Sequence, residues 1–208
     1  LARIQHYLYE KGEYNPELEN SFAPALVNRI DRNTGGIVIA AKTAEALRIL
    51  NQKMKDRELI KLYLCIAVGN FEKKARKCPG SSQSRSLEKN EKQNRVYISN
   101  KPRDGAKTIK TKYRVLSERN GLSLVEVDLL TGRTHQIRAH MAYIGHPLLG
   151  DSKYGKNEYN RKSGYKYQAL YSYKLVFKFT TDAGCLEYLN GKSFEVKNIW
   201  FLNEFNEL

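Results

Sequence analysis

The segment LIKLYLCIAVG, residues 59–69, constrains the fold most, because its side chains alternate with the two-residue period of a β-strand. Aliphatic side chains occupy every second position from Ile60 to Val68. Tyr63 falls between them and is predicted to point away from the main aliphatic face. The segment is therefore predicted to be a strand with two distinct faces.

Two dipeptides that are typical of hairpin turns predict how other strands pair. Asn120-Gly121 separates the strand-like runs KTKYRVLSE and LSLVEVDLL, and Asn190-Gly191 separates two short alternating runs in CLEYLNGKSFEV. Another strand is expected at RVYIS, residues 95–99. Most of the sheet is therefore expected to be antiparallel.

Residues 35–57 predict a strand followed by a helix. The run GGIVIAAK, residues 35–42, is short, rich in β-branched residues and begins with glycines, which indicates a buried strand. Thr43 is a suitable N-cap residue, and the apolar residues after it recur at helical spacing. We expect a helix from about residue 44 to residue 57.

A second helix is predicted within TGRTHQIRAHMAYIGHPLLGD, between the two hairpins. Thr134 is expected to cap this helix and Gly145 to end it, with a stripe of apolar residues along one side. Arg133 then lies at the start of the helix and Arg138 in its second turn. Arg133 is either a phosphate contact or a solvated charge, and the sequence favours neither.

Residues 70–94 lack apolar periodicity and are rich in Lys, Ser, Gln and Glu. Such a segment buries too little apolar surface to offset its ordering entropy. We expect a mobile basic insertion, more a solvated loop than an RNA-binding arm, within a single catalytic domain that spans residues 1–208. Because the sequence begins with Leu1, we expect it to be truncated at its N-terminus.

The net charge predicts a polyanionic partner. The chain has 36 Lys and Arg residues against 22 Asp and Glu residues, a formal net charge of +14, which favours nucleic acid. It has no apolar run near the roughly 20 residues of a membrane span and no secretion signal, so no membrane association is expected. The three cysteines lack metal-ligand spacing, which favours a reducing, cytoplasmic setting without a metal site.

Asp31 lies between Arg29 and Arg32, directly before the predicted strand at residues 35–42. Taken alone, this arrangement is most simply a structural ion pair. In a strongly basic protein it also fits a functional carboxylate that nearby positive charge keeps ionised. In the second interpretation, the arginines hold an RNA backbone and the carboxylate faces sugar or base.

Three blocks of the chain, NRIDRNTGG, KLYLCIAVG and LLTGRTHQIRAHMAYIGHPLLGDSKYG, resemble in this order the sequence blocks of the RluA-type pseudouridine synthases. This family includes the large-subunit ribosomal RNA enzymes RluC and RluD. GAKTIKTKYRVL and YQALYSYKLVF are also similar to family segments. The resemblance implies an α+β pseudouridine synthase fold, with a mixed, mainly antiparallel sheet, flanking helices and a basic active-site cleft. No S4-type RNA-binding domain is recognisable in the chain.

The resemblance also implies roles for individual residues. Asp31 falls on the catalytic aspartate, which either attacks C1′ of the target uridine or removes its C2′ proton. Tyr63, otherwise read as a packed sheet tyrosine, falls on a residue that stacks on the base and takes part in proton loss from C5. Arg138 falls on the arginine that pairs with the carboxylate. The residues expected to bind RNA are Arg29, which would enter the RNA stack when the uridine is flipped out, Arg32 and Arg133.

Two positions depart from the family pattern, because Asn28 replaces a usual His and Gly35 a usual Ser. We expect them to affect fine positioning more than activity. The sequence therefore predicts a cytoplasmic, monomeric, cofactor-independent RNA pseudouridine synthase, an isomerase that acts on ribosomal RNA in preference to transfer RNA. The alternative is a non-catalytic RNA-binding or ribosome-assembly factor on the same fold. General DNA binding would rest on charge alone.

Overall fold

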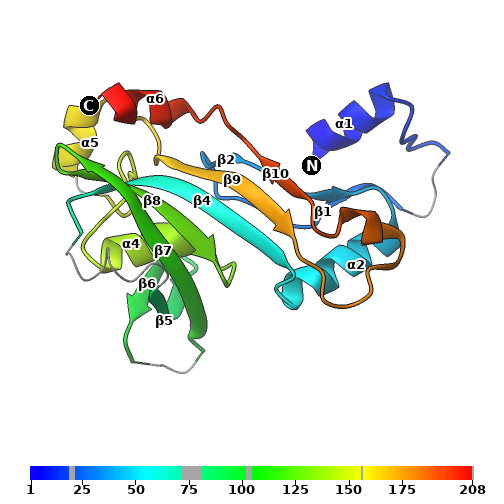
Figure 1. The fold of residues 1–208 in the computed structure, drawn as a ribbon, viewed down its shortest axis with the longest axis horizontal. Coiled ribbons are helices and arrows are strands. Elements are labelled where there is room, and N and C mark those ends of the chain that lie inside the picture. Colours follow the sequence, from blue (N-terminus) through cyan, green and yellow to red (C-terminus); the bar gives the residue numbers. More distant parts are fainter. Residues whose placement is uncertain (19–21, 72–80, 102–104, 156, 208) are drawn as a thin grey trace. The chain divides into compact units, whose positions relative to one another are not determined.

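A computed structural model describes residues 1–18, 22–71, 81–101, 105–155 and 157–207 (Figure 1). These residues form two compact units. The first comprises Leu1–Ile30, Ile37–Ile60 and Leu175–Phe194, and the second comprises Asp31–Gly36, Lys61–Lys174 and Glu195–Leu208. The single catalytic domain that the sequence predicts stays a prediction. None of the described helices is both long enough and apolar enough to span a membrane.

The first unit contains mainly helices around a small apolar core. Its second helix confirms the sequence prediction, because Thr43 Oγ1 accepts a hydrogen bond from the Ala46 N–H at 3.1 Å and caps the helix. Leu50 of this helix packs with Leu59 and Phe177 in the core. The elements are α1 (Ala2–Glu10), β1 (Ala25–Leu26), β3 (Ala40–Ala41), α2 (Ala44–Lys55) and the 3₁₀ helix η1 (Gly184–Leu189).

The sheet is mainly antiparallel, as the sequence predicts. Among the described residues it has eight strands, in the order β10-β9-β4-β8-β7-β5-β6, with β2 added to β9 in parallel. The ladders from β4 through β8, β7 and β5 to β6 are all antiparallel. The strands are β2 (Gly35–Gly36), β4 (Leu59–Val68), β5 (Ser81–Asn90), β6 (Arg95–Ser99), β7 (Lys107–Arg119), β8 (Leu122–Leu129), β9 (Leu170–Phe177) and β10 (Ser193–Glu195).

The central hairpin of the second unit is the one that the sequence predicts. Asn120 and Gly121 join β7 to β8 with φ angles of 48° and 75°, the left-handed conformation that a tight two-residue hairpin turn requires. On β4, Leu64 and Ile66 pack against Phe201 and Phe205 of α6 (Trp200–Glu207). The remaining helices are α4 (Gln136–Tyr143) and α5 (Asn157–Ser163), and α4 lies beside β6 and β7 (Figure 1).

The predicted basic insertion at residues 70–94 is partly ordered into strands. Residues 81–90 form β5, which pairs with both β7 and β6, whereas residues 72–80 lie outside the described residues. Leu87 of β5 and Val96 of β6 are buried in one cluster with Ile109 of β7 and Ala139 of α4. The expectation of a solvated loop is therefore wrong for the described part of the insertion, because β5 pairs with two strands and Leu87 is buried in the cluster that β6, β7 and α4 complete. Its mobility stays a prediction.

Two other local predictions are wrong. The expected single strand at residues 35–42 is divided, because Gly35–Gly36 pair with β9 while Ala40–Ala41 pair with β1. Gly36 has a φ of 116°, and a Cβ there would lie 2.2 Å from the Ser172 carbonyl oxygen. The expected hairpin around Asn190-Gly191 is also absent, because η1 occupies the first of its two runs. The turn there closes with a hydrogen bond from the Lys192 N–H to the Leu189 carbonyl at 3.0 Å, and the Gly191 N–H donates to the Phe177 carbonyl at the end of β9 at 2.9 Å.

Candidate active site

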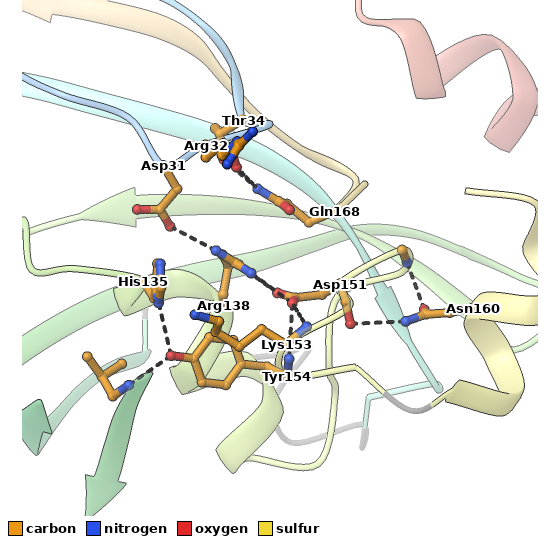
Figure 2. A network of polar contacts seen from close by, with 12 residues as sticks. Asp31, Arg32, Thr34, His135, Arg138, Asp151, Lys153, Tyr154, Asn160 and Gln168 are labelled. Carbon is orange, nitrogen blue, oxygen red and sulfur yellow. Dashed lines mark hydrogen bonds and ion pairs between the residues drawn. The ribbon is translucent and has the colours of Figure 1, made fainter. Parts of the chain in front are cut away.

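Asp31 lies in a tight turn at the start of the second unit. The turn closes with a hydrogen bond from the Thr34 N–H to the Asp31 carbonyl at 3.0 Å, and Asn33 adopts a left-handed φ of 67°. The buried side chain of Gln168 also holds this turn (Figure 2). Its Nε2 donates to the Arg32 carbonyl at 2.7 Å and to Thr34 Oγ1 at 3.1 Å. The Asp31 side chain remains partly open to solvent, with an exposed fraction of 21%.

Arg138 projects from α4, whose start differs from the prediction. The N-cap residue is His135, with a left-handed φ of 52° and no capping side-chain bond, so the prediction that Thr134 caps this helix is wrong. Gln136 fixes the start of the helix instead: it donates to the Lys110 carbonyl at 3.1 Å and to Thr111 Oγ1 at 3.0 Å on β7. Gly145, with a φ of 92°, follows the end of the helix as predicted.

The guanidinium of Arg138 faces two carboxyl groups (Figure 2). Its Nη1 lies 3.7 Å from Asp31 Oδ2, which brings together the two residues that the resemblance pairs. Its Nε and Nη2 donate to the two oxygens of Asp151 at 2.7 and 2.9 Å. The contact with Asp151 is thus the bidentate one, and the contact with Asp31 is a longer ion pair through the remaining nitrogen.

Asp151 is a site residue to which the sequence analysis gave no role. Its side chain is fully buried, and Oδ1 also accepts hydrogen bonds from the backbone N–H groups of Lys153 and Tyr154 at 2.9 and 3.0 Å. Burial would raise the pKa of Asp151, but the hydrogen bonds and charge of Arg138 outweigh it and lower this pKa. Burial alone would lower the pKa of Arg138, but the hydrogen bonds and charge of Asp151 outweigh burial and raise this pKa. The sequence signal for Asp151 is its place in the same family-like block as Arg138.

Tyr154 supports the same network from the other side. Its hydroxyl accepts a hydrogen bond from the Val96 N–H at 2.9 Å and lies 3.0 Å from His135 Nδ1. The guanidinium carbon of Arg138 lies 5.4 Å from the centre of the Tyr154 ring, and that of Arg95 lies 5.1 Å from it. Burial raises the pKa of Tyr154, so its hydroxyl remains neutral near neutral pH.

Tyr63 lies on the face of the sheet that α4 covers. Tyr63 pairs with Val127 of β8, and Val127 pairs with Tyr113 of β7, so the three side chains share one face. Thr111, two residues before Tyr113, lies on this face and accepts a hydrogen bond from Gln136 of α4. The Tyr63 side chain is 5% exposed. Burial raises its pKa, a hydrogen bond with Ser172 lowers it, and the nearby charge of Asp31 raises it further. Tyr63, Arg138 and Asp31 therefore belong to one region of the second unit.

The three arginines predicted to bind RNA are exposed. Arg32 follows Asp31 in the turn, and Arg133 precedes α4, where its N–H donates to Gln136 Oε1 at 3.2 Å. Arg29 belongs to the first unit. RNA binding by these three residues stays a prediction.

This arrangement offers a carboxylate that is held but not enclosed. Asp31 is accessible enough to meet a reacting atom, and one guanidinium nitrogen lies close to its oxygen. Such a group can act as a nucleophile or as a general base. Within the described residues, no three His, Cys, Asp or Glu side chains lie in an arrangement that could hold a metal ion.

Comparisons with known proteins agree with the sequence resemblance. A family model described as RNA pseudouridylate synthase matches residues 4–143. An uncharacterized RNA pseudouridine synthase of Mycoplasma genitalium is 39% identical over 177 residues, which cover 84% of this chain and 52% of that protein. Ribosomal large subunit pseudouridine synthase D of Borreliella burgdorferi is 38% identical over 160 residues, covering 76% of this chain and 45% of that protein. The chain thus spans about half the length of the curated relatives that it matches.

Two solved structures share the fold. The human RNA pseudouridylate synthase domain containing 1 protein superposes with a TM-score of 0.63 and 21% identity, covering 89% of this chain and 79% of that one. The domain containing 4 protein superposes with a TM-score of 0.64 and 20% identity, covering 86% and 72%. The predicted α+β fold with a mainly antiparallel sheet is therefore confirmed.

Proposed function

Because the family match covers more than half of its residues, this chain belongs to the RNA pseudouridylate synthase family, and from this we propose that it isomerises uridine to pseudouridine in structured RNA. The observation that carries the proposal is the partly exposed Asp31 carboxylate held 3.7 Å from the guanidinium of Arg138. The isomerisation breaks the bond between N1 and C1′, forms a bond between C5 and C1′, and moves the C5 proton. Since no electrons are gained or lost overall, the reaction needs no redox cofactor.

Asp31 is the residue that we propose to start the reaction. As a nucleophile it forms a bond to C1′ while N1 leaves with the bonding electron pair, and C5 of the turned base later displaces it. As a base it removes the C2′ proton, so that N1 leaves with the bonding pair and a glycal forms; C5 then bonds to C1′ as the proton returns to C2′. Deuterium at C2′ distinguishes the two routes, because only the second breaks the C2′–H bond and gives a primary isotope effect.

Arg138 is proposed to orient the Asp31 carboxylate. Two of its nitrogens are committed to Asp151, and this bidentate pair fixes the plane of the guanidinium. The third nitrogen therefore faces Asp31 from a defined direction. A carboxylate held in this way loses less entropy when it meets the sugar.

Tyr63 is proposed to stack on the target base. Its pKa is raised mainly by burial, so the phenol stays neutral at neutral pH and offers an uncharged ring beside Asp31. The resemblance also assigns Tyr63 a part in the proton loss from C5. A neutral phenol is a weak base, so its protonation state supports the stacking role more directly than a role in proton transfer.

Exposed arginines are proposed to hold the RNA. Arg29, Arg32 and Arg133 supply positive charge for phosphate contacts, and the cost of unstacking the target base, a few kcal/mol, is offset by such contacts. Ribosomal RNA is the proposed substrate because two curated relatives are named ribosomal large subunit pseudouridine synthases. We propose a cytoplasmic monomer as its working form.

Mapping of pseudouridines in total RNA tests this proposal. Carbodiimide-dependent reverse-transcription stops would be compared between cells with and without the gene. We expect a site that disappears on deletion and is restored by the wild type and by the control Asp56→Asn, which alters an exposed carboxylate of the first unit. Asp31→Asn is expected to abolish modification while keeping RNA affinity within a few-fold.

The possible outcomes separate the two candidate functions. Restoration of the site by Asp31→Asn would refute the catalytic assignment of this residue. If deletion removes no site although the protein binds RNA, the non-catalytic RNA-binding or ribosome-assembly function replaces the enzymatic one.

A further inference from the structure

The contact between Asp31 and Arg138 is too long to position the carboxylate by itself. At 3.7 Å it is an ion pair without a hydrogen bond, whereas Arg138 makes two short hydrogen bonds to Asp151. The place from which the Asp31 side chain leaves the backbone is therefore set by the turn, and Arg138 can orient the carboxylate only if the turn holds it there. That turn has one internal backbone hydrogen bond, from Thr34 to Asp31, and contains a left-handed Asn33.

Gln168 supplies the other fixed points of this turn. Its side-chain amide has two N–H groups, and they go to the Arg32 carbonyl and to Thr34 Oγ1, on either side of Asn33. Gln168 is 4% exposed and Thr34 is 7% exposed, so water does not readily replace these bonds. The buried amide thus holds the turn in the conformation that presents Asp31.

The backbone around Gln168 is joined to the segment that carries Asp151. The Ala169 N–H donates to the Leu149 carbonyl at 2.8 Å, and the Ala169 carbonyl accepts from the Ile66 N–H of β4 at 3.1 Å. Gln168 holds the turn of Asp31, and Asp151 holds Arg138. Gln168 and Asp151 therefore lie on two segments that are hydrogen-bonded to each other. Each of the two residues holds one member of the Asp31–Arg138 ion pair.

We infer that Gln168 is a positioning residue, which holds the Asp31 turn so that the carboxylate meets the substrate at the distance from Arg138 that the reaction needs. This inference rests on the proposed function and adds to it a residue that touches neither Asp31's carboxylate nor Arg138. Its substitution is expected to slow the chemical step and to leave RNA binding nearly unchanged.

The test uses Gln168→Met, which keeps the length of the side chain and removes both donors. Its matched control is Ser123→Ala, because Ser123, like Gln168, is a buried polar residue of the second unit, and its Oγ donates to the Gly69 carbonyl at 2.8 Å on a different part of the sheet. Unmodified large-subunit ribosomal RNA, transcribed in vitro, serves as the substrate. Single-turnover rates, RNA dissociation constants, unfolding midpoints and the exchange rate of the Thr34 amide are measured for each protein.

We expect Gln168→Met to lower the single-turnover rate by about 10- to 100-fold, the scale of a small misplacement of a reacting group, with an RNA dissociation constant within twofold of the wild type. The Thr34 amide is expected to exchange faster than in the wild type and in Ser123→Ala. Ser123→Ala is expected to lower stability and to keep the wild-type rate, so a general loss of stability does not mimic the result.

Two results overturn the inference: a Gln168→Met rate within twofold of the wild type, or an unchanged exchange rate of the Thr34 amide. Equal losses of rate and RNA affinity also contradict it, since they indicate a binding role. If the wild type itself makes no pseudouridine, the proposed function fails instead, and the Thr34 exchange rate alone decides whether Gln168 holds the turn.

Discussion

Arg138 forms ion pairs with two carboxylates, and we predict that their removal has very different effects on stability. Asp151 is fully buried and accepts four hydrogen bonds, two from Arg138 and two from backbone N–H groups. In Asp151→Asn one amide hydrogen faces a donor of Arg138, and the guanidinium loses its buried counter-charge. Breaking a buried pair in this way costs about 3–5 kcal/mol of the free energy of unfolding.

Asp31→Asn is the matched comparison, because it alters the same guanidinium. Asp31 is 21% exposed and has one contact with Arg138 at 3.7 Å, so its substitution is expected to cost about 0–1 kcal/mol. Urea unfolding of the wild type and both variants at neutral pH measures the two values. Equal effects of the two substitutions, or a loss below about 1 kcal/mol for Asp151→Asn, would refute the assignment of Asp151 as the main partner of Arg138.

The pH dependence gives an independent check of the same prediction. Because the pKa of Asp151 is lowered in the folded protein, its contribution is present above its ordinary pKa of 3.8 and is lost as the pH falls through the folded value. The difference in stability between wild type and Asp151→Asn is therefore expected to shrink in acid. A difference that stays constant as the pH falls below 3.8 would contradict this linkage.

Two further predictions concern the charge of the protein. RNA affinity is expected to fall steeply with salt concentration in filter binding. Arg32→Gln and Arg133→Gln should each reduce the slope of log affinity against log salt by about one. An affinity that does not change with salt would exclude phosphate contacts. Burial, and then the charge of Arg85, lowers the pKa of His140 from 6.5 to about 4. The folded protein therefore resists protonation there, and stability is expected to fall between pH 6.5 and about 4. In urea unfolding over this pH range, His140→Gln should weaken the dependence of stability on pH. If the stability of the variant depends on pH as strongly as that of the wild type, other groups cause the dependence.

Two elements with a strong local signal could be predicted from the sequence, although the same signal at Asn190-Gly191 was misleading. The Asn120-Gly121 hairpin and the helix capped by Thr43 both depend on residues that are close in the chain, and both are confirmed. The start of α4 could not be predicted in this way. Thr134 has the right side chain for a cap, but Gln136 bonds to Lys110 and Thr111, so a distant strand fixes the helix start.

The same limit explains what the sequence missed in the insertion and in the candidate site. Leu87 stands among polar residues and gives no periodic pattern, and it is buried only because β6, β7 and α4 supply the rest of its cluster. Asp151 fully buries its carboxylate against Arg138, thirteen residues earlier in the chain, and nothing in its immediate neighbours indicates this. The resemblance paired Arg138 with Asp31, but it gave no sign that a second carboxylate takes most of its hydrogen bonds.

The shared guanidinium also has an electrostatic consequence for how RNA enters. One positive group stands against the two carboxyl groups of Asp31 and Asp151, so this cluster carries a formal excess of one negative charge. For the RNA substrate that we propose, we expect phosphates to be held by exposed cations such as Arg32 and Arg133 and not beside the two carboxylates. On the proposed function, we expect an uncharged ribose and base to approach Asp31 more readily than a phosphate. The charge distribution would then favour contact of the backbone with the surface and entry of the flipped nucleoside.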